Sequence, residues 1–209
     1  MYITHYSFNK QNSLNRITEY NKTDVHNLAS KLGQIEGTAY ERFKNIEEYY
    51  PKRIKTEEWL YKTVQAKAIV PKVKSPWYFV LGESSALQVG FGINAFKQRI
   101  ELDIINDDDI SFTIGDSMGV FNMPEKYKVV YTKSEILYMY YNGFLNNPTE
   151  FLYLQNKHKY IEAQLWNDKY FYANDNSLLS NVYNHYTPTL IIFQHIYPQN
   201  INIHKNSSH

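Results

Sequence analysis

The stretch that decides the fold class reads YIEAQLW and spans Tyr160 to Trp166. In a strand, alternate side chains point to opposite faces. Glu162 and Gln164 therefore share one face with the two flanking aromatic residues, and the three apolar residues between them point to the other face. This period of two predicts a strand. A carboxylate and an amide between aromatic rings are typical of a cleft floor, and the structural alternative is an amphipathic edge strand.

Further strand-type runs surround this segment. They span residues 1–8, 77–80, 98–105, 110–114, 127–131 and 189–195, and each is rich in β-branched or aromatic residues. The run 75–85 is expected to be a buried strand that enters a loop of small residues. Because several of these strands are short and consecutive, we expect a mainly antiparallel sheet.

Helical periodicity is concentrated in the first third of the chain. Apolar residues recur every three to four positions from Thr23, a predicted N-cap, to Pro51, with a break expected near Gly33 or Gly37. A second helix is predicted over 56–68. The T-x-x-E spacing at 132–135 predicts a short capped helix later in the chain. We therefore predict one α+β domain over residues 1–209, with a helical segment at 22–70.

Composition excludes several classes of protein. The 209 residues carry a net charge of +1 and include no cysteine. A pervasive basic surface for nucleic acid is therefore excluded, and so are disulfides and thiolate metal sites. No metal-binding motif is present, so we expect no metal. The first residues lack the pattern of a signal peptide, and no apolar run is long enough to span a membrane, which predicts a cytoplasmic protein.

Two histidines lie in the pattern H-x-[ST], at His5 and His185. Paired motifs of this form are the catalytic pattern of two-histidine phosphoesterases, in which one imidazole activates the nucleophile and the other protonates the leaving oxygen. A two-histidine phosphoesterase is therefore one alternative reading of the chain.

A second alternative involves no catalysis. Tyrosine makes up 20 of the 209 residues, and tyrosine is favoured in protein interfaces. The chain could therefore be a binding or immunity-type module whose partner is another protein.

Taken in order, four segments resemble the DarT-type ADP-ribosyltransferases. They are residues 2–7 (YITHYS), 13–17 (SLNRI), 76–79 (PWYF) and 160–163 (YIEA). The resemblance implies an ADP-ribosyltransferase-like fold in which a first strand carries a histidine, a helical region carries an arginine, and a late strand carries the catalytic glutamate. It also implies NAD as the substrate, and a protein of toxin or phage-conflict type.

The resemblance further implies roles for particular residues. His5 would hydrogen-bond the ribose or the carboxamide of NAD, and Tyr78 would stack on nicotinamide. Either Arg42 or Arg53 would pair with the pyrophosphate, and the choice between them stays open. The catalytic set is then Glu162, His5 and Arg42, and the NAD-binding set is His5, Tyr78, Arg53 and Gln164.

Glu162 has the central role in that scheme. Its carboxylate would bind a ribose hydroxyl, stabilise the positive charge that develops on the sugar and accept the proton of the acceptor. Gln164, on the same strand face, would orient either substrate. The near-neutral charge gives no indication of a nucleic-acid acceptor, so a protein or a small molecule stays open as the acceptor.

Overall fold

A computed structural model describes residues 1–7, 16–92, 94–146 and 160–170. These residues form an α+β fold around a six-stranded sheet with the strand order β3-β1-β2-β6-β4-β5, and the named strands pair in antiparallel fashion. The strands are β1 Tyr2–Ser7, β2 Trp77–Leu81, β3 Phe96–Glu101, β4 Ile110–Ile114, β5 Tyr131–Thr132 and β6 Ile161–Leu165. The predicted α+β class with an antiparallel sheet is confirmed.

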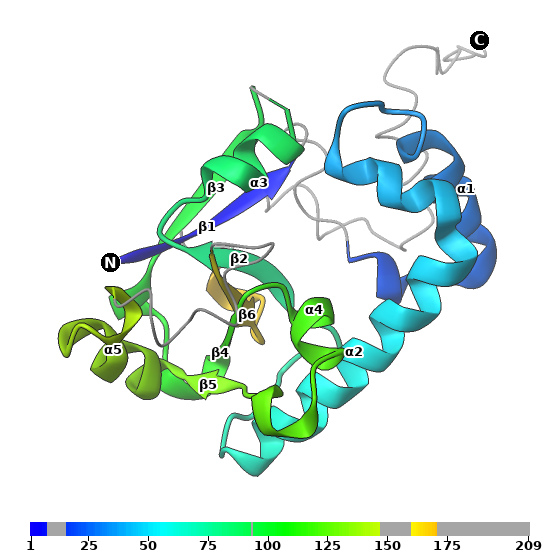
Figure 1. Ribbon diagram of the computed structural model, residues 1–209. Coiled ribbons are helices and arrows are strands. Elements are labelled where there is room, and N and C mark those ends of the chain that lie inside the picture. Colours follow the sequence, from blue (N-terminus) through cyan, green and yellow to red (C-terminus); the bar gives the residue numbers. More distant parts are fainter. Residues whose placement is uncertain (8–15, 93, 147–159, 171–209) are drawn as a thin grey trace, which may run out of the picture.

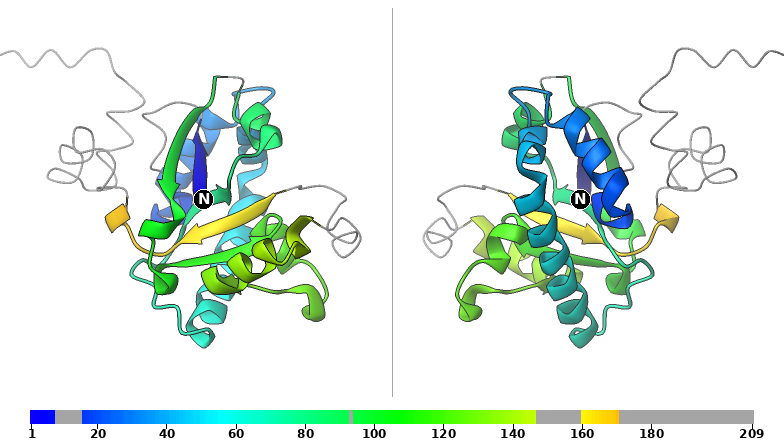
Figure 2. Two further views of the ribbon diagram at one scale, coloured as in Figure 1. Left: turned by 90° about the vertical axis from the view of Figure 1, so that its left-hand side faces the viewer. Right: turned by 90° about the vertical axis from the view of Figure 1, so that its right-hand side faces the viewer.

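Helices cover both faces of this sheet. They are α1 Lys22–Leu32, α2 Ile46–Ala66, α3 Ser85–Gly90, α4 Ser117–Phe121 and α5 Lys133–Tyr141, and the 3₁₀ segment η3 Ala39–Asn45 links α1 to α2. The long α2 and α1 lie on one side of the sheet and α5 lies on the other (Figures 1 and 2). Among the described residues, no helix has the length and apolar character needed to cross a membrane.

The helical segment predicted over 22–70 is present, and its break lies at Gly33. A β-carbon at Gly33 would lie 2.9 Å from a carbonyl oxygen of α1 and 3.0 Å from the backbone nitrogen of Lys44, so glycine allows α1 and η3 to approach closely. The N-cap is Asn21, whose side chain accepts a hydrogen bond from a backbone N–H in the first turn. The predicted cap, Thr23, lies inside α1, so that prediction is wrong.

The sequence predicts a helix end at Pro51, but Pro51 lies inside α2. A proline removes one backbone donor and is tolerated best in the first turn of a helix, but Pro51 lies beyond that turn of α2. Directly after it, α2 buries Arg53, Thr56 and Glu57, so the helix continues through the proline. The end of the first predicted helix and the second predicted helix are therefore parts of one helix, α2, of 21 residues. Arg53 and Glu57, one turn apart and both buried, share its inner face.

Two predicted strands are shorter in the structure. The strand expected over 98–105 ends at Glu101, because a 3₁₀ turn, Leu102–Ile104, follows it. Of the run 127–131, only Tyr131 belongs to a strand. The small-residue loop expected after β2 leads directly into α3, which is capped by the side chain of Ser84. The last predicted strand, 189–195, lies outside the described residues.

The two faces of the sheet differ in chemistry. The face towards α5 is apolar, and its core includes Phe79, Phe112, Ile136, Ala163 and Leu165. The face towards α2 carries a row of polar side chains, because β2, β6 and β4 align their outward positions in register. Gln164 lies opposite Tyr78 on one neighbouring strand and Ser111 on the other, and Glu162 lies opposite Val80 and Thr113.

The pairing between β1 and β2 is short. Its register covers Ile3 with Leu81 and Thr4 with Val80, whereas β1 pairs with β3 from Tyr2 to Ser7. The ladder between β1 and β2 therefore ends in the middle of the sheet. Side chains from both strands line the space beyond that point, which is where a cleft forms.

Candidate functional site

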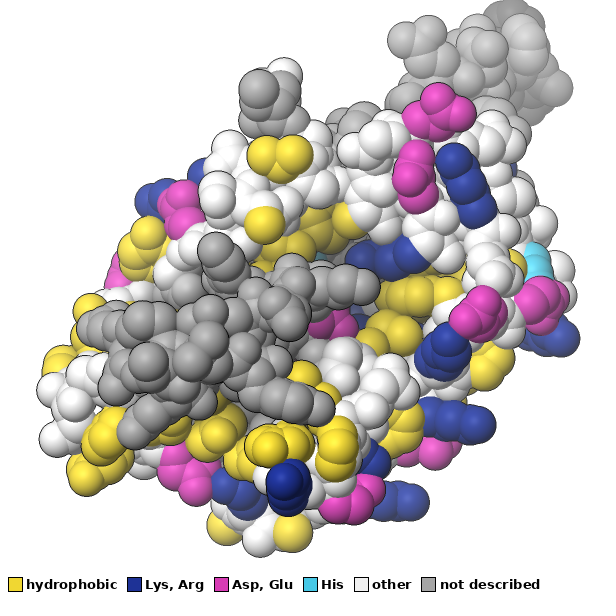
Figure 3. All heavy atoms as spheres, in the orientation of Figure 1, with side chains coloured by type: hydrophobic (Ala, Val, Ile, Leu, Met, Phe, Trp, Pro, Cys, Tyr) yellow, Lys and Arg dark blue, Asp and Glu magenta, His cyan; other side chains and the backbone are white. Residues whose placement is uncertain are grey.

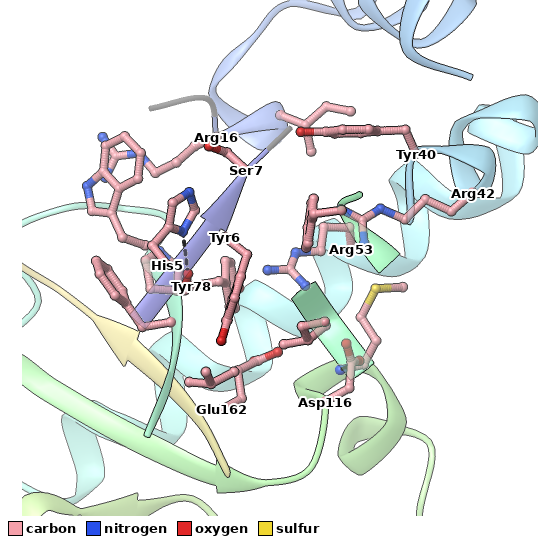
Figure 4. Close-up of a pocket in the computed structure, with 18 of the residues that line it drawn as sticks. His5, Tyr6, Ser7, Arg16, Tyr40, Arg42, Arg53, Tyr78, Asp116 and Glu162 are labelled. Carbon is pink, nitrogen blue, oxygen red and sulfur yellow. Dashed lines mark hydrogen bonds between the residues drawn. The ribbon is translucent and has the colours of Figure 1, made fainter. Parts of the chain in front are cut away.

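The cleft has a volume of about 270 Å³ and lies between the diverging strands, α3, the α1–η3 region and α4. Figure 3 shows the molecule hollowed at this place, with basic and acidic side chains visible inside. In Figure 4, His5 and Arg16 lie along one side and Arg42 and Tyr40 along the other, with Arg53 between them and Glu162 and Asp116 below. Five of the six predicted site residues line it: His5, Arg42, Arg53, Tyr78 and Glu162.

Glu162 supplies a buried carboxyl group to the cleft floor and is 5% exposed. Its Oε1 accepts hydrogen bonds from the backbone N–H of Ser117, at 3.3 Å, and from Nε2 of Gln164, at 3.0 Å. Burial raises the pKa of Glu162 to about 7, the charge of Asp116 adds to this rise, and Arg53 opposes it. The carboxyl group therefore exchanges its proton near neutral pH.

The position of Glu162 follows from the alternation read in the sequence. β6 places Glu162, Gln164 and the adjoining Trp166 on the face towards α2, as predicted. The alternative of an amphipathic edge strand is wrong, because β6 lies between β2 and β4 with both faces covered. A central strand positions its side chains firmly, since neighbours on both sides fix its register.

His5 reaches the cleft from β1, beyond the point where the β1–β2 ladder ends. Its Nδ1 lies 2.6 Å from the carbonyl oxygen of Tyr78, and Figure 4 marks this contact. A carbonyl oxygen can only accept, so Nδ1 carries a hydrogen and donates it. The imidazole also packs against Phe79, with ring centroids 5.4 Å apart. These contacts fix the orientation of the ring.

Arg53 is buried, and its guanidinium is held from two directions. Its Nε donates to Oε1 of Glu57 at 2.9 Å, and its guanidinium carbon lies 3.5 Å from the centre of the Tyr78 ring. The Tyr78 hydroxyl donates to the same Glu57 oxygen at 3.1 Å. Within the described part of the chain, neither Nη atom of Arg53 has a hydrogen-bond acceptor, so this pair of donors is available to a ligand.

Arg42 lies nearer the rim and is held by aromatic rings. Its guanidinium lies over Phe43, Tyr49 and Phe91 at 5.2, 5.4 and 6.0 Å from the ring centroids. No carboxylate among the described residues pairs with it. Cation–π contacts leave the N–H groups in the plane of the guanidinium open to an anion. The two arginines between which the sequence could not choose therefore both offer free donors to the cleft.

Gln164 is the predicted site residue that the structure does not bring into the cleft. It is fully buried beneath the floor and bonds to other side chains of the sheet. The structure therefore gives Gln164 no place on the cleft lining, and the prediction that Gln164 orients a substrate stays a prediction. The alternation placed it on the correct face, but it could not indicate that Tyr78, Ser111 and α2 enclose that part of the face.

The cleft also contains residues that sequence reasoning did not assign to it. Asp116 caps α4 by accepting hydrogen bonds from the backbone N–H groups of Met118 and Gly119. Arg16 stacks on Trp77 at 4.4 Å and pairs with Asp168 at 3.2 Å. The signal for Asp116 was its position directly after a strand and a glycine, which is typical of a functional loop.

Two further predictions, on metal binding and on the histidine pair, concern residues that the structure describes only in part. No group of three or more metal-ligating side chains occurs among the described residues. His185, the second histidine of the phosphoesterase pattern, lies outside the described residues, so the pair of His5 and His185 stays a prediction.

Comparison with known proteins identifies no relative of this chain. No family model matches the chain, and neither a curated protein nor a solved structure matches it significantly.

Proposed function

We propose that this protein is an NAD-dependent ADP-ribosyltransferase with an ADP-ribosyltransferase-like fold. The observation that carries the proposal is one cleft that joins a buried carboxyl group, Glu162, to an oriented histidine, His5, and to the free donors of Arg53 and Arg42. The motif resemblance suggested these residues while they were spread over the sequence from position 5 to position 162. Chance similarity of short motifs would not be expected to gather them in one place.

The cleft has groups suited to two parts of NAD, the pyrophosphate and the nicotinamide ribose. Arg53 and Arg42 can donate to the two phosphates, since guanidinium groups bind phosphate oxygens in a bidentate manner. A volume of about 270 Å³ lies just below the range of about 300–1,000 Å³ for sites that bind drug-sized ligands. It suits the nicotinamide ribose, with the pyrophosphate lying towards the rim at Arg42.

Tyr78 has a different role from the stacking platform that the resemblance implies. One face of its ring is covered by Arg53, and its hydroxyl is bonded to Glu57. We assign Tyr78 to holding Arg53 in place, and His5 to binding the ribose or the carboxamide.

In the proposed reaction, the bond between nicotinamide and the ribose C1 breaks, and its electron pair leaves with nicotinamide. The sugar then passes through an oxocarbenium-like state. The ionised carboxylate of Glu162 stabilises that positive charge. The nucleophile of the acceptor forms the new bond to C1, and its proton passes to Glu162, whose pKa of about 7 suits this exchange.

Release of nicotinamide with water as the acceptor tests the proposal, because it does not require the natural acceptor. The purified full chain is titrated with NAD by calorimetry, and nicotinamide release is then followed. We expect Glu162→Gln to retain NAD binding and to lose release, and His5→Ala to weaken binding. Glu125→Gln makes the same chemical change at an exposed carboxylate and should alter neither. Absence of NAD binding, or unchanged release in Glu162→Gln, would refute the proposal.

A protein-binding module is the second candidate function, and one observation favours it. Large aromatic side chains are exposed together on α5 and the turn that follows it: Tyr138, Tyr140, Tyr141 and Phe144 are 64%, 43%, 75% and 39% exposed. Grouped exposed aromatic residues are typical of interaction surfaces. If NAD does not bind, this surface becomes the first place to search for a partner.

A further inference from the structure

A continuous chain of buried side chains supports Glu162 from beneath the cleft floor. Nε1 of Trp166 donates to Oγ of Ser111 at 2.8 Å, and Oγ of Ser111 donates to Oε1 of Gln164 at 2.9 Å. Nε2 of Gln164 then donates to Oε1 of Glu162 at 3.0 Å and to Oγ1 of Thr113 at 2.9 Å. Trp166, Ser111, Thr113 and Gln164 are all fully buried.

The direction of this chain follows from which atoms can donate. The indole N–H of Trp166 can only donate, so Oγ of Ser111 accepts from it and has its single hydrogen left for Gln164. Ser111 therefore binds the amide oxygen of Gln164, and the amide NH₂ faces Glu162. The flipped amide would place its oxygen against a carboxylate oxygen, which is repulsive when Glu162 is ionised.

The carboxyl group at the end of the chain is left with one oxygen free. Both hydrogen bonds that the described residues give Glu162 reach Oε1, from Gln164 on β6 and from the backbone of Ser117 at the start of α4. Oε2 has no protein donor among the described residues. The arrangement holds one oxygen from within the protein and leaves the other to a ligand in the cleft.

We propose that Gln164 is a positioning residue, held in one amide orientation by Trp166 and Ser111, which fixes Glu162 so that its Oε2 faces the bound substrate. This inference rests on the proposed function for the identity of that substrate, but the support itself can be tested without it. Burying these polar groups beside the apolar cluster of Leu60 and Val64 costs desolvation energy that apolar side chains would not require. The series of hydrogen bonds ends at the carboxyl group of Glu162 in the cleft, which is the group that it holds in place.

The test compares variants along the chain with a matched control. Gln164→Leu removes the donor to Glu162 with little change in volume, and Ser111→Ala removes the hydroxyl that orients the amide. Thr56→Val is the control, since Thr56 is a buried hydroxyl whose hydrogen bond goes to a backbone carbonyl within α2. Three quantities are measured: the pKa of Glu162 by NMR of the labelled carboxyl carbon, and the kcat and the KM of nicotinamide release.

For Gln164→Leu we expect the pKa of Glu162 to rise by about one unit, because the ionised form loses a donor. We also expect kcat to fall about tenfold with little change in KM. Ser111→Ala should also raise the pKa of Glu162 and lower kcat, but by less than Gln164→Leu. Thr56→Val should change neither the pKa nor kcat. A folded Gln164→Leu variant with an unchanged pKa would overturn the inference, and if that variant does not fold, Ser111→Ala decides by the same criterion. If the native protein does not turn over NAD but the pKa still rises, the support of Glu162 stands and the proposed function fails.

Discussion

The guanidinium carbon of Arg53 lies 3.5 Å from the centre of the Tyr78 ring, and both side chains bind the same carboxylate oxygen of Glu57. Stacking fixes the plane of the guanidinium, and the ion pair fixes its rotation within that plane. The two Nη atoms are therefore oriented before any ligand arrives. Such preorganisation reduces the entropy lost on binding.

Breaking this buried arrangement should destabilise the protein. Arg53→Met leaves the carboxylate of Glu57, itself 6% exposed, without its ion-pair partner, and we expect a loss of about 3–5 kcal/mol in the free energy of unfolding. The double variant Arg53→Met/Glu57→Met should recover much of that loss, because no unpaired charge remains. Urea denaturation of the two variants measures both values, and equal stabilities would contradict the ion pair.

Glu162 should make stability depend on pH in a defined window. Its folded pKa, about 7, lies above the ordinary value of 4.5, so the folded state binds the proton more tightly than the unfolded state. This contribution to stability is complete below about pH 4.5 and is lost as the pH rises towards 7. The shift corresponds to about 3 kcal/mol at most. Unfolding free energies from pH 4 to 8 should fall less steeply in Glu162→Gln than in the native protein, and parallel curves would contradict the raised pKa.

Asp116 should act on Glu162 through its charge. Asp116 raises the pKa of Glu162, so Asp116→Asn should lower that pKa and move the acidic limb of the pH profile of nicotinamide release to lower pH. Asparagine can still cap α4, so the fold should be retained. NMR titration of Glu162 checks the shift directly, and an unmoved titration curve would exclude the coupling.

Arg42 should contribute to phosphate binding without contributing much to stability. Arg42→Ala removes an exposed guanidinium held by aromatic rings, and we expect about tenfold weaker binding of NAD, with a smaller effect of salt on the affinity of the variant. Arg99→Ala is the matched control, because Arg99 is an exposed arginine of β3 that does not line the cleft. Calorimetry in low and high salt measures the NAD affinity of both variants. An equal loss of affinity in Arg42→Ala and Arg99→Ala would show a general charge effect.

Local patterns in the sequence predicted the elements of the site better than their assembly. The alternation around Glu162 is a local property, and it correctly predicted a strand with Glu162 and Gln164 on one face. Whether that face is open or enclosed depends on Tyr78 and Ser111, which belong to strands distant in the sequence. A single sequence contains no direct signal for that pairing, which is why Gln164 was placed in the cleft.

The helical region illustrates the same limit. Proline often marks a helix end, but α2 continues through Pro51 and buries Arg53, Thr56 and Glu57 directly after it. Had α2 ended there, Arg53 and Glu57 would not be one helical turn apart. The sequence could therefore identify Arg53 as a candidate, but not the ion pair that orients it.

The β1–β2 ladder ends early, and this affects how fast backbone amides of β1 and β2 exchange with solvent. Backbone amides beside this seam have fewer partners from the neighbouring strand than amides within a full ladder, so they should exchange with solvent sooner. A molecule that contacts both His5 and Glu162 would join the two halves of the sheet and slow that exchange. Hydrogen–deuterium exchange at β1 and β2 would therefore report occupancy of the cleft for a compound whose identity is still unknown.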